Sequence, residues 1–269
     1  MLSLRKALFV SATLILGGAS AASAADLYGG GLKDAPAMAP MPAPSAGWYA
    51  RVDGGYNWYT NPNIGMDQGF TTYDAKMDGA WSVGGGIGRY FGRGFRGDIT
   101  VDHLFDADTE TSMRTFDDCC HGVAKFDFNS TVVLANLYYD FNRGGRFVPY
   151  IGAGIGFAHN ETSSGTVATD CGCDGIIAKG SSNQFAAAAM AGISWRIRGG
   201  ETTYVGGMKD EPVAVSSGHA LYLDVGYRFL YLGDVKTGDL AWGTDESVDP
   251  DVKDITAHQI RVGLRYDLN

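Results

Sequence analysis

Arginine and aspartate residues recur at alternate positions in several segments of this sequence. Arg51 and Asp53 stand two residues apart, as do Arg96 and Asp98, so each pair would share one face of an extended strand. Guanidinium and carboxylate groups on one face pair through charge-assisted hydrogen bonds. We predict one ionic network from five cations and six anions, whose charges nearly cancel: Arg51, Asp53, Arg96, Asp98, Asp102, Asp140, Asp224, Arg228, Arg261, Arg265 and Asp267.

The four cysteines fall in two short groups, Cys119-Cys120 and Cys171-Gly172-Cys173. Cysteine is a metal ligand by type, yet neither spacing is the C-x-x-C of a structural zinc site. The N-terminus indicates export to an oxidising compartment, so we predict disulfides and no metal. A bridge between the adjacent Cys119 and Cys120 would be strained, which favours pairs between the groups, although three connectivities remain open.

Catalytic patterns are weak in this sequence. A nucleophilic triad would need a serine and an acid near a histidine. No serine stands two residues after His103, His159 or His258 on the same strand face, and His219 lies in a predicted connection. We therefore predict that the chain is not an enzyme and binds no cofactor.

The segments that carry these residues alternate apolar and polar positions with the period of two that half-buried strands show. Glycine makes up 39 of the 269 residues, a composition that favours strands and turns over helices. Framed as 11 residues each, the segments would cross the ~25 Å apolar band of an outer membrane at a tilt of about 40°. The eight segments are 48–58, 81–91, 95–105, 131–141, 147–157, 185–195, 221–231 and 258–268.

Aromatic residues gather at both ends of these segments on their apolar side. Trp48 and Phe147 stand at one end and Trp58 and Phe157 at the other, with mostly aliphatic residues and glycine between. Two aromatic belts around an apolar band are typical of a membrane, whereas a soluble sandwich needs bulky residues at its strand centres. We predict an all-β fold, an eight-stranded antiparallel transmembrane β-barrel over residues 47–269.

The N-terminal residues predict export. Residues 1–24 begin with Arg5 and Lys6, continue into a short apolar stretch and end Ala22-Ser23-Ala24, the order of a signal peptide. Residues 25–46 are rich in alanine, proline and glycine and predict a disordered extension in the periplasm. The net charge of −9 gives no electrostatic reason to bind nucleic acid.

The predicted connections alternate in length, as they do in outer-membrane barrels. Long outer loops would cover 59–80, 106–130, 158–184 and 232–257, and short periplasmic turns 92–94 and 142–146. The third periplasmic segment, 196–220, is much longer. Within it Thr202 to Gly206 and Pro212 to Val215 could form a hairpin, which leaves ten strands as an alternative.

Several short motifs occur in a characteristic order: Gly47-Trp48-Tyr49, Asn136 to Phe141, Val148 to Gly154, Gly226-Tyr227-Arg228 and Arg261 to Tyr266. Together they resemble the small outer-membrane β-barrel surface antigens of alphaproteobacteria, which are Gram-negative. The resemblance covers residues 47–269 and implies an OmpA-like transmembrane barrel without a peptidoglycan-binding domain. This chain departs from the family in its long third turn and in ending Tyr266-Asp267-Leu268-Asn269.

Two functions remain open for such a barrel. An eight-stranded barrel has room inside only for its own side chains, so paired lumen charges predict a closed scaffold whose outer loops interact with an extracellular ligand. The alternative is a narrow porin-like channel for ions or small solutes. In either case we expect contacts with outer-membrane lipids and with the insertion machinery, which would read the closing strand.

Overall fold

The computed structural model of the chain describes residues 47–65, 70–92, 94–115, 120–141, 145–172, 174–199, 202–205, 213–216, 219–241 and 251–268. The predicted signal peptide (1–24) and extension (25–46) lie outside these residues, as do Cys119 and Cys173. No helix in the part that the structure describes is long and apolar enough to cross a membrane.

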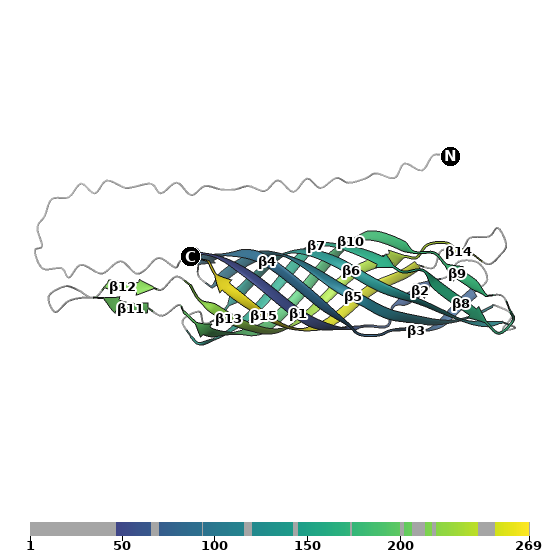
Figure 1. Ribbon diagram of the computed structural model, residues 1–269, viewed down its shortest axis with the longest axis horizontal. Helices are drawn as coiled ribbons and strands as arrows, with labels where there is room; N and C mark the ends of the chain where they lie inside the picture. The colour runs from purple at the N-terminus through teal and green to yellow at the C-terminus, as the bar shows by residue number, and fades with distance from the viewer. Residues whose placement is uncertain are drawn as a thin grey trace, which may run out of the picture. The chain divides into compact units, whose positions relative to one another are not determined.

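Long antiparallel strands make up most of the described chain (Figure 1). The pairings run β1–β4–β5–β6–β7–β10–β13–β15, and β15 pairs with β1, so the hydrogen-bonded path returns to its start. The prediction of an all-β antiparallel fold is confirmed. The strands of this ring are β1 (Trp48–Tyr59), β4 (Ala80–Gly92), β5 (Phe95–Thr115), β6 (His121–Asp140), β7 (Phe147–Thr162), β10 (Gly180–Arg198), β13 (Leu221–Lys236) and β15 (Asp251–Asp267).

The strands run farther than the 11-residue frames, and the predicted outer loops are wrong in this respect. β5 and β6 pair from Phe95 opposite Tyr139 to Arg114 opposite His121, deep into the range predicted as the loop 106–130. Shorter strands extend the same sheet at one end of the ring (Figure 1). These are β2 (Asn63–Gly65), β3 (Phe70–Met77), β8 (Gly165–Thr169), β9 (Gly175–Ile177) and β14 (Leu240–Ala241).

The segment 196–220 contains the hairpin that the sequence left open as a possibility. β11 (Thr202–Val205) and β12 (Val213–Ser216) pair antiparallel as a two-stranded sheet of their own. Among the described strands they pair only with each other, so the hairpin adds no strand to the ring.

Burial alternates along the ring strands and separates two faces. In β6, every second residue from Gly122 to Asp140 is buried. The buried face changes character along the strand, from Phe126, Phe128 and Val132 nearer its start to Asn136 and Asp140 nearer its end. The ring thus encloses an apolar part and a polar part, and the polar part holds the candidate site.

Candidate functional site: a buried ionic network

The predicted network residues lie on the inward face of the ring strands. Five arginines and five aspartates have side chains no more than 8% exposed, and because their numbers are equal their formal charges sum to zero. They are Arg51, Arg96, Arg228, Arg261, Arg265, Asp53, Asp98, Asp102, Asp140 and Asp224. The remaining predicted member, Asp267, is only partly buried and accepts a hydrogen bond from the Tyr90 hydroxyl at 2.8 Å.

Arg265 and Asp224 form a two-pronged ion pair. Arg265 Nε lies 3.0 Å from Asp224 Oδ2, and Nη2 lies 3.3 Å from Oδ1. Arg265 also donates to Ser194 Oγ at 3.0 Å and to the Tyr90 hydroxyl, and its guanidinium lies 4.3 Å from the centre of the Tyr222 ring. Carboxylate, hydroxyl and aromatic groups therefore contact the buried Arg265 guanidinium from several sides.

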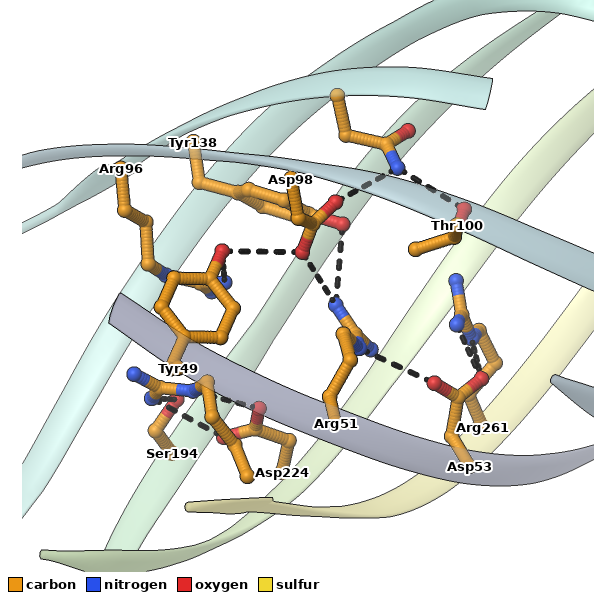
Figure 2. A network of polar contacts seen from close by, with 12 residues as sticks. Tyr49, Arg51, Asp53, Arg96, Asp98, Thr100, Tyr138, Ser194, Asp224 and Arg261 are labelled. Carbon is orange, nitrogen blue, oxygen red and sulfur yellow. Dashed lines mark hydrogen bonds and ion pairs between the residues drawn. The ribbon is translucent and has the colours of Figure 1, made fainter. Parts of the chain in front are cut away.

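Arg51 joins two parts of the network (Figure 2). Its Nε lies 3.1 Å from Asp53 Oδ2 and its Nη1 lies 3.3 Å from Asp98 Oδ2. The other oxygen of Asp53 accepts from Arg261, whose Nη2 also lies 3.6 Å from Asp102 Oδ1. A continuous chain of opposite charges thus runs through the interior.

Two arginines contact Asp102. Arg228 Nη1 makes the shorter contact with Asp102 Oδ2, at 2.9 Å, and Arg261 Nη2 lies 3.6 Å from Asp102 Oδ1. Arg228 Nε and Nη2 have no acceptor among the described residues.

Tyrosine rings surround Arg96. Its guanidinium carbon lies 4.0 Å from the centre of the Tyr138 ring and 5.0 Å from that of Tyr150, while Nε donates to Asp140 Oδ1 at 3.0 Å. A desolvated guanidinium over aromatic faces is favourable, and an arginine does this better than a lysine. Arg96 is fully buried as a result of packing as well as of charge.

Glycines make room for these rings. A Cβ at Gly88 would stand 2.4 Å from the Tyr49 ring, and one at Gly152 would stand 2.5 Å from the Tyr138 ring. Any larger residue at either position would push a ring out of the network.

The tyrosines were missed by sequence reasoning, which considered only charged residues. Tyr49 donates to Asp98 Oδ2 at 3.0 Å, and the Tyr138 hydroxyl accepts from Arg51 Nη1 at 3.1 Å (Figure 2). Asn136 likewise donates to Asp98 Oδ1 at 2.8 Å. The signal was available, because each of these residues has the inward parity of its strand.

One small hollow lies beside the network. The hollow lined by Tyr90, Asp140, Val148, Tyr222 and Arg265 has a volume of only about 10 Å³, the least that admits one water. Beyond the charges, fully buried apolar residues occupy the inward face, among them Leu104, Phe128, Leu230, Leu232 and Val252.

The outward face of the same strands is apolar. Val52, Ile87, Ile99 and Ile155 have exposed fractions between 55% and 63%. Aromatic side chains are exposed at both ends of this band, among them Trp48, Phe91, Phe147 and Trp195 at one end and Trp58, Trp81, Phe105 and Phe157 at the other. Arginines thus face inward at the same levels at which isoleucine and valine face outward.

A disulfide joins two distant parts of the extended sheet. Cys120, beside the start of β6, is bonded to Cys171, which follows β8, with their Cα atoms 5.5 Å apart. Next to it, the His121 backbone NH donates to Asp170 Oδ1 at 2.8 Å. Cys120, Asp170 and Cys171 place possible metal ligands within 4.8 Å of one another, but both sulfurs are committed to the disulfide.

Comparison with known proteins identifies several that are similar to this chain. No family model matches it. Salmonella typhimurium (strain LT2) has a protein, outer membrane protein PagN, that is 24% identical over 74% of this chain and 77% of its own length. Among solved structures, OprG, an outer membrane protein from Pseudomonas aeruginosa, gives a TM-score of 0.47 at 13% identity, with 82% of this chain and 96% of that chain covered. Neisserial surface protein A gives 0.42 at 15%, covering 81% and 95%.

A sequence match of wider extent is with an uncharacterized protein of Brucella abortus (strain 2308). The two are 30% identical over 92% of this chain and 93% of the relative. The chain belongs to the same protein family as this Brucella protein.

Proposed function

We propose that the chain is an eight-stranded transmembrane β-barrel of the outer membrane with a closed lumen, which presents its extended sheet to the cell exterior. On this proposal it is a surface scaffold and not an enzyme. The carrying observation is the pairing of β15 with β1, which leaves the ring without a free edge, as a membrane requires. The name of the relative PagN supports the same compartment.

A row of polar residues supports one boundary of the membrane band. His103, Thr131, His159 and Asn183 lie opposite one another across β5, β6, β7 and β10, all on the outward side. The His103 ring lies 3.1 Å from Thr131 Oγ1, and the His159 ring lies 2.8 Å from Asn183 Oδ1. From this row toward the polar part of the ring, the outward residues are apolar. We therefore propose that the row marks the boundary of the membrane on the side of the cell exterior.

The barrel itself is tested by gel mobility and circular dichroism. A closed barrel should resist detergent until it is boiled, so the unboiled protein should migrate differently and give a β-sheet spectrum. Identical mobility before and after boiling, with a helical spectrum, would contradict the proposal.

The closed lumen is tested by conductance in planar bilayers. We expect the parent protein to conduct poorly, because neutral ion-paired layers and apolar side chains fill its interior. Arg261→Ala should raise conductance, since it removes the cation between Asp53 and Asp102. Large and steady conductance of the parent would contradict the closed scaffold.

A narrow channel for small ions is the second candidate, and one observation favours it. Three nitrogens of Arg96 and Arg228 are buried with no acceptor among the described residues. Buried polar groups in proteins are usually satisfied by water when no protein atom serves them. A thin file of water past these arginines would carry ions, and the same bilayer recording decides between the two candidates.

A further inference from the structure

Three arginines line one hollow at the end of the ring where β7 begins and β10 ends. The hollow has a volume of about 520 Å³ and is lined by Arg146, Arg196, Ile197, Arg198 and Gly199. No carboxylate stands among these described lining residues. Such a local excess of positive charge contrasts with the net charge of −9 for the whole chain.

The backbone holds the arginines together. The Arg196 NH donates to the Arg146 carbonyl at 2.8 Å, which ties the start of β7 to the end of β10. The pairing of β10 with β13 then shifts register between Arg196 and Arg198, so Ile197 is an extra residue. A bulge of this kind redirects the following side chain.

The hollow adjoins the apolar outward face. The Arg146 guanidinium carbon lies 5.6 Å from the centre of the Trp195 ring, whose neighbour across the strands, Phe147, stacks on it at 6.0 Å. Phe147 is 59% exposed and Ile197 48% exposed. A ligand seated here meets guanidinium groups and an apolar surface side by side.

We propose that this hollow binds the anionic headgroup of a phospholipid in the periplasmic leaflet, with the acyl chains along Phe147, Trp195 and Ile197. The inference rests on the proposed barrel, which places the outward aromatic rings at the level of the headgroups. Arginine forks match the oxygens of a phosphodiester in two-pronged contacts. A soluble anion would use only the polar half of the site, which is why we assign a lipid.

The test measures the preference of the full chain for spin-labelled phosphatidylglycerol over phosphatidylcholine in mixed vesicles. Arg146→Gln with Arg198→Gln should reduce the preference by about fivefold for each arginine removed. Lys76→Gln with Lys125→Gln is the matched control, because it removes the same charge from residues paired with Asp78 and Glu110 outside the hollow. The control should keep the parent preference.

Each outcome decides the inference. An equal loss in both double variants, or no loss in either, would overturn it. Inorganic phosphate at matched ionic strength should not displace the labelled lipid, and displacement would overturn the assignment to a lipid in favour of a free-phosphate site. A folded, heat-modifiable band is checked for every protein. Its absence in the parent would refute the barrel, whereas its presence without lipid preference would refute only this site.

Discussion

The Arg265–Asp224 pair allows the energetics of the network to be measured. Arg265 is 2% exposed, and it meets Asp224 at 3.0 and 3.3 Å. Replacing it by methionine leaves a carboxylate buried without its main partner, which costs about 3–5 kcal/mol in comparable pairs. The loss of its hydrogen bonds to Ser194 and Tyr90 is included in that figure.

Removing both charges should lower the free energy of unfolding by less than removing either charge alone. In R265M/D224N no ion remains uncompensated, so we expect its destabilisation to stay below that of R265M by about 2 kcal/mol or more. The assay is urea unfolding in lipid vesicles, followed by tryptophan fluorescence and by the folded gel band.

The exposed pair Lys76–Asp78 provides the matched control. Its atoms lie 3.0 Å apart, as close as those of Arg265 and Asp224, but the side chains are 70% and 54% exposed. Water already solvates both charges, so K76M and D78N should show no measurable coupling. The reasoning would be refuted if the coupling between Arg265 and Asp224 were no larger than that between Lys76 and Asp78.

Three further predictions concern other parts of the chain. Peptide mapping without reductant should recover Cys120 linked to Cys171, and free thiols at both positions would contradict the disulfide. Cys120→Ser should destabilise the sheet extension by at most about 4 kcal/mol, because the bridge closes a separation of 51 residues. Val225→Arg, in the apolar band, should cost about 2–4 kcal/mol in vesicles, whereas Ile176→Arg, equally outward but in β9, should cost little; similar costs would contradict the band. Partial burial and a hydrogen bond with Asp108 raise the pKa of Asp127. The backbone amides of the sheet extension should therefore be most protected from hydrogen exchange below the ordinary pKa range of aspartate, and should lose that protection as pH rises through the raised pKa. Hydrogen exchange corrected for its intrinsic pH dependence measures this, and D127N should remove the effect; a pH dependence that survives in D127N would contradict it.

The sequence predicted one end of each strand better than the other. β1, β5, β7 and β13 begin at residues 48, 95, 147 and 221, where the alternating frames also begin. Short turns explain this success for β5 and β7, because glycine and arginine at 92–94 and 142–146 interrupt the alternation sharply. Which arginine serves which aspartate was beyond prediction, because partner choice depends on tilt and shear, which no single strand encodes.

The far ends of the strands were missed because the alternation reverses its sense there. Within the band of β15, Ile260 and Val262 face outward while Arg261 faces inward. Toward the start of that strand the polarity is exchanged, with Ile255 and Ala257 buried and Asp254 and His258 exposed. A strand prediction that requires an apolar residue at every second position therefore ends where the apolar residues move to the intervening positions.

The reversal has a physical cause that bears on function. Inside a membrane the outward side chains meet lipid and polar groups turn inward, whereas beyond the interface the outward side chains meet water and the interior can become an ordinary apolar core. In β6 the outward residues pass from Asp127, Asn129 and Thr131 to Val133, and all inward residues stay buried. The same ring of strands thus supplies a charged core in one part and an apolar core in the other, which in the proposed barrel are the parts inside and outside the membrane. Because the apolar core supports the extended sheet, we expect that, in the proposed barrel, residues exposed on this sheet can be replaced without disturbing the buried ion pairs.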